Sequence, residues 1–371
     1  MKNSKKIFVN GSLLIVESLA RSGADVFVGY PITPSNYLYL YSTKRLPLTF
    51  HAPDEITTLQ WMCGLSASGK LPVTATSFPG FALMIESINM AYMMELPMVI
   101  VLAQRLGPST GTATCGASGD LLLIKGMISG GYPVPTFAIS DFKDCWELPQ
   151  EAVKTALTLR TPVIVLTSKE ITMTNRSFDI ETLKDIKKIE RKFYNSEETY
   201  IPYKPEENFV PQFLPLYSNK HQVRLTASTH DQKGILQHST KEALENTARL
   251  QKKIVSNLKD FTFYEYIEDG NQNLIVTFDV SSNISKEAIR ELRKENKKVS
   301  LLVAKTVVPV PEVYYEIISK YKKVYVVEEN LNGQLCEILF GNKTPNNVIK
   351  INSIGKMISI DKIKEEVRKN G

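Results

Sequence analysis

The chain has 371 residues, of which 43% are hydrophobic and 23% charged, and this is the ordinary composition of a folded protein with two or three domains. The formal net charge of +6 comes from interspersed charges without a basic stripe that interleaves aromatic residues, which argues against nucleic-acid binding. Every apolar run is too short for a membrane-spanning helix.

The N-terminal twenty residues briefly imitate a signal peptide. Asn10, Gly11, Ser12 and Glu17 interrupt the apolar stretch, and no convincing small-residue cleavage site follows. We therefore expect a cytoplasmic protein that has no contact with a membrane.

Strand-like and helix-like runs alternate along the first part of the chain. Helices are predicted over residues 12–22, 35–44, 55–69, 80–95 and 142–159. Short apolar runs between them predict strands, namely DVFVGY, LTFHAP, PVTATS, PMVIVLAQ, PTFAIS and TPVIVLTS. Strands of about six residues that alternate with helices are typical of βαβ units. The sequence therefore predicts an α/β fold with a parallel sheet over residues 1–170.

The pattern changes in the second half. Residues 171–250 contain a segment rich in proline and aromatic residues, YIPYKPEENFVPQFLPLYSN, which predicts an extended excursion over a domain surface. A helix is predicted over 239–258, with Ser239 or Thr240 as its cap. Strands and helices alternate again over 251–371, which predicts a second, smaller parallel sheet. Asp-Gly in EDGNQN (268–273) precedes a strand, so we interpret it as a turn.

Ligands of open parallel sheets bind at the carboxyl ends of the strands, so the loops at those ends are the candidate sites. Thr33, in GYPITPS, follows the first of these strands. Pro34 fits the first position of a helix, so Thr33 is a candidate helix cap, and residue types alone favour that role. The alternative is a hydroxyl that faces a ligand. Asp54 and Glu55 follow the next strand, either as helix-start carboxylates or as a carboxylate at the ligand edge.

Two further loops carry polar groups. Ser77, Pro79 and Gly80 predict a tight turn before a helix, whose N–H groups are able to meet a polar ligand. Arg105 stands directly after an apolar strand, where a fixed guanidinium can bind a carboxylate through two hydrogen bonds. The alternative for Arg105 is an ion pair with Asp54 or Glu55 across the sheet edge.

The four cysteines are spread singly along the chain, at Cys63, Cys115, Cys145 and Cys336. Structural zinc sites and iron–sulfur clusters need clustered thiolates. We therefore expect reduced, apolar thiols and no metal site in this chain.

Together, the motifs GYPITPS, PDEI, TATS-PG, PMVIVLAQR-GPSTG and Gly-Asp at 119–120 resemble the α subunit of 2-oxoacid:ferredoxin oxidoreductases. TASTHDQKG, VVPVPE and VVEENLNGQL resemble later regions of the same subunit, so the resemblance covers almost the whole chain. It implies an N-terminal thiamine-pyrimidine-binding domain and a C-terminal transketolase-like domain. It also implies oxidative decarboxylation of 2-oxoglutarate, a branched-chain or another 2-oxo acid, with thiamine diphosphate and coenzyme A.

The resemblance assigns roles to the residues of these loops. Glu55 matches the glutamate that contacts the pyrimidine nitrogen of thiamine, and Ser77, Pro79 and Gly80 match the neighbouring cofactor-binding loop. Arg105 matches the arginine that binds the substrate carboxylate, and Thr33 the threonine beside the substrate.

The family's division of labour implies a partner chain. A β subunit would bind the diphosphate, Mg²⁺ and a [4Fe–4S] cluster, and would pass electrons to ferredoxin within a hetero-oligomer such as α2β2. Two alternatives stay open, namely a non-oxidative thiamine-dependent decarboxylase or carboligase built on the same half-site, and a non-catalytic subunit. The sequence also departs from the family pattern, because Phe78 replaces a usual glycine, Pro53 replaces an acidic residue, residues 112–118 differ from the usual form and TFDVSS lacks a usual glycine.

Overall fold

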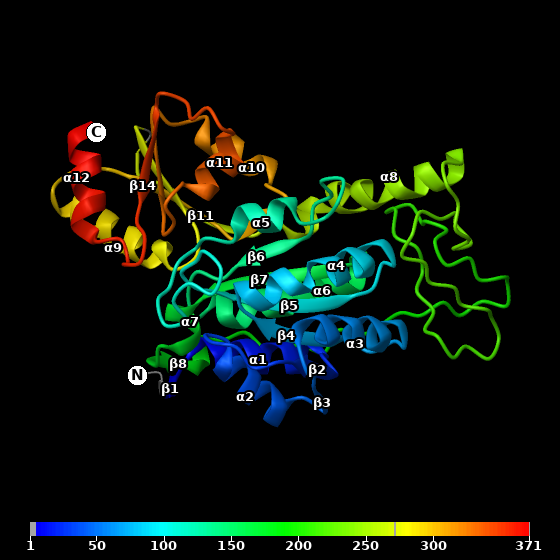
Figure 1. The fold of residues 1–371 in the computed structure, drawn as a ribbon. Coiled ribbons are helices and arrows are strands. Elements are labelled where there is room, and N and C mark those ends of the chain that lie inside the picture. The colour runs from blue at the N-terminus through cyan, green and yellow to red at the C-terminus, as the bar shows by residue number, and fades with distance from the viewer. Residues whose placement is uncertain (1–4, 271, 371) are drawn as a thin grey trace.

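The computed structural model describes residues 5–270 and 272–370 and contains two large sheets with flanking helices (Figure 1). The larger sheet has seven strands in the order β12-β6-β7-β5-β4-β2-β3, all parallel except for β12, which is antiparallel to β6. Its strands are β2 (Val26–Gly29), β3 (Leu48–His51), β4 (Pro72–Thr76), β5 (Met98–Gln104), β6 (Thr136–Ala138), β7 (Pro162–Ser168) and β12 (Thr306–Val308).

Helices cover both faces of this sheet. The chain passes from β2 to β3 and from β6 to β7 in one direction, but from β3 through β4 to β5 in the other. Because such crossovers are right-handed, α2 and α6 lie on one face, and α3 and α4 on the other. The helices are α1 (Gly11–Ser22), α2 (Asn36–Arg45), α3 (Glu55–Ala67), α4 (Phe78–Met93), α5 (Leu121–Gly126), α6 (Asp144–Leu159) and α7 (Lys169–Met173).

The strand order reverses between β2 and β4. From β2 the chain leads to β3 on one side, whereas from β4 it leads to β5 on the other. Such a reversal opens a crevice beyond the carboxyl ends of the two strands. The loops that carry Thr33 and Ser77 begin at this crevice.

The smaller sheet has the order β14-β13-β10-β11-β9, and only β9 is antiparallel to its neighbour. Alternate residues of its strands face two apolar clusters, Val276 and Val326 on one side and Ile275 and Tyr325 on the other. The prediction of two parallel-rich α/β sheets is therefore confirmed. Its elements are β9 (Tyr264–Ile267), β10 (Asn273–Thr277), α9 (Ser281–Lys294), β11 (Ser300–Ala304), α10 (Glu312–Ile318), β13 (Lys323–Glu328), α11 (Gln334–Phe340), β14 (Val348–Asn352) and α12 (Ile360–Asn370).

The connection between the sheets is long and mostly irregular. β1 (Lys6–Val9) pairs with β8 (Arg176–Asp179), and a short 3₁₀ helix follows at Ile180–Thr182. Residues 183–240 then form the loops at the right of Figure 1, from which α8 (Lys241–Ser256) runs back toward the smaller sheet. The predicted cap of α8 is confirmed, because Thr240 Oγ1 accepts a hydrogen bond from the Ala243 amide. A second 3₁₀ helix, Leu258–Phe261, ends the connection.

One prediction of local structure is wrong, and another can be compared with the structure only in part. We expected the second half to form only its own sheet, but β12 joins the larger sheet beside β6, so the chain crosses back after β11. Gly270 has a φ of +79°, as a turn between β9 and β10 requires, whereas Asn271 of the same predicted turn lies outside the described residues.

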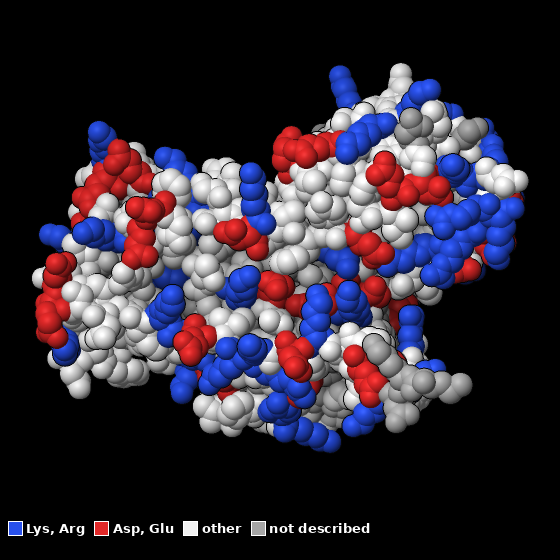
Figure 2. Space-filling model, turned by 180° about the vertical axis from the view of Figure 1, so that it is seen from behind, with Lys and Arg blue, Asp and Glu red and all other residues white. Residues whose placement is uncertain are grey.

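The surface carries both signs of charge. Figure 2 shows acidic and basic side chains mixed over one face, with basic groups crowded at the end occupied by the smaller sheet. Several of these are paired, for example Arg293 with Asp269 and Arg368 with Glu295. Within the described part of the chain, no helix is long and apolar enough to cross a membrane.

Candidate active site

Thr33 lies in a tight turn after β2. The Ser35 amide donates to the Ile32 carbonyl over 2.9 Å, and the cis Thr33–Pro34 peptide lies inside this turn. Helix α2 begins only at Asn36, with Ser35 at the cap position. The expectation that Thr33 caps the helix and Pro34 starts it is therefore wrong, because the turn separates both from the helix. Thr33 Oγ1 instead accepts a hydrogen bond from Asn36 Nδ2 at 2.9 Å.

Arg105 reaches across the end of β4 to this turn. Its Nη1 donates to the Thr33 carbonyl oxygen over 2.6 Å, and the side chain is only 5% exposed. The alternative that Arg105 pairs with Asp54 or Glu55 is not seen among the described ion pairs. Its Nε has no acceptor among the described residues. The structure thus brings the predicted Thr33 and Arg105 together and leaves the Nε–H of the guanidinium without a hydrogen bond to the described residues.

Glu55 is the first residue of α3. Asp54 is the cap, because its Oδ1 accepts a hydrogen bond from the Thr57 amide at 2.7 Å. Glu55 does not cap the helix and is only 6% exposed. Burial raises the pKa of Glu55, its own backbone amide lowers the pKa, and the Asp54 charge raises it. A buried carboxylate with a raised pKa is suited to holding or sharing a proton.

Gly80 lies directly against Glu55. A Cβ atom built at Gly80 would lie 2.5 Å from Glu55 Oε1 and 2.3 Å from Thr76 Oγ1, so only glycine leaves room for this carboxylate. Helix α4 already begins at Phe78, so Pro79 and Gly80 lie in its first turn rather than in a turn before it, as we had expected. Ser77 is the residue before the helix, and its buried Oγ has no partner among the described residues.

The residue pattern did not predict a chain of hydrogen bonds beside Arg105, which we call the polar relay and which joins Asp120, Gln104, Asp279 and Ser118. Asp120 lies near Arg105, and burial raises the pKa of Asp120 to about 7 against the opposing effect of the Arg105 charge. The Asp120 amide donates to Gln104 Oε1 at 3.1 Å, and Gln104 Nε2 donates to Asp279 Oδ2 at 3.0 Å. Ser118 Oγ donates to the same Asp279 oxygen at 3.0 Å. This relay joins the larger sheet to the smaller one.

The sequence held only weak signals for this relay. Asp120 was noticed as part of the Gly-Asp pair at 119–120, without a role. Asp279 lies in TFDVSS, which lacks the glycine usual in the family, and it adopts a left-handed φ of +53°. Aspartate tolerates that conformation better than most residues.

Comparison with known protein families shows to which family the chain belongs. Residues 17–249 match the family described as "Pyruvate flavodoxin/ferredoxin oxidoreductase, thiamine diP-bdg", and this match covers more than half of the chain. The chain belongs to this family. The match includes Thr33, Glu55, Ser77, Pro79, Gly80 and Arg105.

Relatives of the chain within this oxidoreductase family carry names of subunits. The chain is 30% identical to "2-oxoglutarate synthase subunit KorA" of Methanocaldococcus jannaschii, over 94% of this chain and 95% of the relative. It superimposes with a TM-score of 0.92 and 27% identity on a "2-oxoglutarate:ferredoxin oxidoreductase from Magnetococcus marinus with 2-oxoglutarate, coenzyme A and succinyl-CoA bound". That superposition covers 100% of this chain and 66% of the other. Subunit names imply a multi-subunit enzyme.

A third structure supports the fold alone. A "Split gene transketolase, inactive beta4 tetramer" matches with a TM-score of 0.56 and 13% identity, over 98% of each chain. This chain thus has the transketolase-like architecture that its resemblance to the oxidoreductase family implied.

Proposed function

We propose that this chain is the α subunit of a thiamine diphosphate-dependent 2-oxoacid:ferredoxin oxidoreductase that converts a 2-oxo acid to an acyl-CoA. The observation that carries the proposal is a buried carboxylate, Glu55, at the same sheet edge as a buried guanidinium, Arg105. The names of the relatives favour 2-oxoglutarate as the substrate, with a branched-chain or other 2-oxo acid as the alternative.

The chain's residues fit the pyrimidine end of thiamine. Glu55 is buried, has a raised pKa and rests on Gly80, where a side chain would displace it. The first turn of α4, preceded by Ser77, adds N–H groups at the same place. Bound thiamine diphosphate would supply the carbon nucleophile and the electron sink that decarboxylation requires.

Each residue has a separate task in this proposal. The Glu55 carboxyl holds a proton beside the pyrimidine nitrogen, and its low exposure strengthens that interaction. Arg105 binds the substrate carboxylate, and the Thr33 carbonyl fixes the guanidinium beforehand. Because the guanidinium is already held, less conformational freedom is lost when the substrate binds.

The proposal includes a partner chain. Phe50, Ile56 and Trp61 are between 41% and 44% exposed, and the rings of Phe50 and Trp61 are in edge contact at 6.3 Å. Phe50 belongs to β3, an edge strand of the larger sheet, and Ile56 and Trp61 belong to α3. Exposed apolar groups next to Glu55 favour a second chain at this face. We propose a β subunit that binds the diphosphate, Mg²⁺ and a [4Fe–4S] cluster and reduces ferredoxin, within an α2β2 enzyme of the cytoplasm.

We also propose that the chain consists of three units with different roles. Residues 1–170 would form the thiamine-pyrimidine half-site, 171–250 the excursion and connecting helix, and 251–371 the transketolase-like unit. The relay through Gln104 and Asp279 supports a fixed arrangement of the first and third of these units.

The test is an assay of the chain co-expressed with its β subunit. A viologen dye, coenzyme A and a panel of 2-oxo acids are supplied, and dye reduction and acyl-CoA are measured. We expect both to depend on one 2-oxo acid and on coenzyme A. An aldehyde or carboligation product without dye reduction would instead favour the non-oxidative alternative, and no reaction with any acid would favour a non-catalytic subunit.

A further inference from the structure

A cavity of 520 Å³ lies at the opposite end of the larger sheet from Glu55 and Arg105. Lys70, Pro97 and Arg160, which line it, precede β4, β5 and β7, so the cavity is at the amino ends of these strands. The excursion forms another part of the wall, through residues 189–193, 206, 208 and 210–213. The volume is within the range of small-molecule sites, which is about 300–1,000 Å³. None of the proposed catalytic residues lines this cavity.

Arg160 is the notable group of the cavity lining. It is 3% exposed, and its Nη1 donates to the carbonyls of Pro202, Pro211 and Gln212 at distances of 3.2, 3.2 and 2.8 Å. Its guanidinium lies over the Phe213 ring, 4.9 Å from the ring centre. By contrast, Nε and Nη2 are buried and have no acceptor among the described residues, so a ligand in the cavity reaches them only when neighbouring side chains move aside. These two nitrogens form one edge of the guanidinium, and that edge matches the paired oxygens of a carboxylate or a phosphate.

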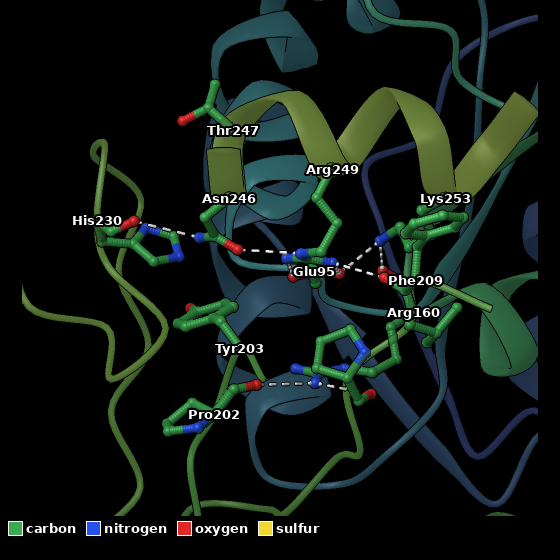
Figure 3. A network of polar contacts seen from close by, with 12 residues as sticks. Glu95, Arg160, Pro202, Tyr203, Phe209, His230, Asn246, Thr247, Arg249 and Lys253 are labelled. Atoms are coloured by element: carbon green, nitrogen blue, oxygen red, sulfur yellow. Dashed lines mark hydrogen bonds and ion pairs between the residues drawn. The ribbon is translucent and has the colours of Figure 1, made fainter. Parts of the chain in front are cut away.

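The surroundings of Arg160 carry an excess of positive charge (Figure 3). Glu95 is fully buried and pairs with Lys253 at 2.7 Å and with Arg249, both from α8. Lys253 Nζ also donates to the Arg160 carbonyl at 3.0 Å. The charges of Lys253, Arg249 and Arg160 together lower the pKa of Glu95 to about 2, although burial opposes them. One carboxylate thus faces three buried cations.

The rim of the cavity has a mixed composition. Lys70 and Lys192 line it and are exposed, whereas Arg191 is engaged with Asp25. Of the two acidic lining residues, Glu206 accepts a hydrogen bond from Gln212, and Glu190 is exposed. Phe193 and Phe213, in tilted contact at 5.9 Å, supply an apolar wall.

We propose that this cavity binds a small organic anion, with a carboxylate or phosphate group on the free edge of Arg160 and the apolar part against Phe193 and Phe213. Because the guanidinium is shielded from water, hydrogen bonds between charged groups are strong there. Because one wall of the cavity is the excursion, binding stabilises the packing of 189–213 on the sheet. The site is separate from the proposed thiamine half-site and does not depend on that function.

The test titrates the full-length chain with inorganic phosphate and, separately, with succinate, at constant ionic strength in a calorimeter. We expect one saturable site per chain for at least one of them, and the better ligand identifies the group recognised. Thr158 lines the cavity and is exposed, so Thr158→Glu introduces a repelling charge without touching Arg160. This variant is expected to weaken binding by about tenfold or more, whereas the uncharged Thr158→Gln leaves binding unchanged.

Two further variants test whether the anion binds at Arg160 and whether the site is separate from Arg105. Arg160→Lys keeps the charge but removes the paired edge, so it should also weaken binding, provided that circular dichroism shows a folded chain. Arg105→Gln should leave phosphate binding intact, because that residue belongs to the other end of the sheet. The proposal is overturned if neither anion binds saturably to the wild type, if the Thr158→Glu and Thr158→Gln variants bind equally, or if Arg105→Gln abolishes binding.

Discussion

Gly80 shows how one missing side chain shapes the candidate site. The absence of a Cβ lets the Glu55 carboxylate rest on the first turn of α4, beside Thr76. Gly80 is not one of the glycines with a positive φ. A glycine is therefore required at this position for space and not for backbone conformation. The sequence predicted only that Gly80 is part of a turn. It did not predict the contact with Glu55, because a sequence does not show which side chain of α3 approaches the glycine.

Gly80→Ala should therefore displace Glu55. We expect turnover to fall by about tenfold or more, because catalytic groups tolerate little misplacement, and the free energy of unfolding to fall by roughly 1–3 kcal/mol through overpacking. Chemical denaturation and the dye assay measure the two effects. Gly64→Ala is the matched control for stability, since a Cβ there meets no atom of the described residues within 4 Å, and it should gain about 0.5–1 kcal/mol from helix propensity. An active and undamaged Gly80→Ala variant would show that Glu55 is not constrained in this way.

Thr33 and Arg105 illustrate the limit of reasoning from residue types. The position of each after a strand was predictable, because parallel strands end at a common edge. The hydrogen bond between Arg105 Nη1 and the Thr33 carbonyl was not, because it depends on the turn that separates Thr33 from α2. The competing ion pair of Arg105 with Asp54 or Glu55 was equally reasonable from the sequence.

At the scale of elements, periodicity and capping explain which predictions succeeded. Helix α1 ends at Ser22 and α8 begins after the Thr240 cap, both as predicted, and Gly23 closes α1 in a left-handed conformation. The short strands β1, β8, β9 and β12 were missed, and so was β14. Strands of three or four residues have too little pattern of their own, because their pairing partners are distant in sequence.

Helix α8 is attached to the larger sheet by buried charges. Glu95 pairs with Arg249 and Lys253 and has a pKa of about 2. Because this folded-state pKa lies below the unfolded value of 4.5, the pairing stabilises the fold above pH 4.5. That stabilisation is lost as the pH falls from about 5 toward 2.

Glu95→Gln should reveal this contribution. We expect the free energy of unfolding at pH 7 to fall by about 3–5 kcal/mol, since the variant leaves buried cations unpaired. The variant should also lose part of the wild-type decline in stability between pH 5 and 2. Denaturant titrations across this range measure both, with Glu151→Gln as the control, because Glu151 forms a partly exposed pair with Lys154. Equal pH profiles for wild type and Glu95→Gln would contradict the assignment.

At the scale of the whole molecule, the two-sheet architecture was predictable and the contact between the sheets was not. The buried apolar strands and alternating helices indicated an α/β fold, which the superpositions confirm. The relay from Asp120 through Gln104 to Asp279 joins residues up to 175 positions apart. Single residues at that separation leave no periodic signal in a sequence. The buried cations of Arg160 and α8 were missed for the same reason.

The measurement that tests the central claim most directly is the turnover of the assembled enzyme with Glu55→Gln. Glutamine keeps the size of the buried side chain but cannot share the proton. We expect turnover with the preferred 2-oxo acid to fall by about 10²–10⁴-fold, while the subunits still co-purify. Glu86→Gln, on the exposed face of α4, is the control and should retain activity. Wild-type turnover in a correctly assembled Glu55→Gln enzyme would contradict the account.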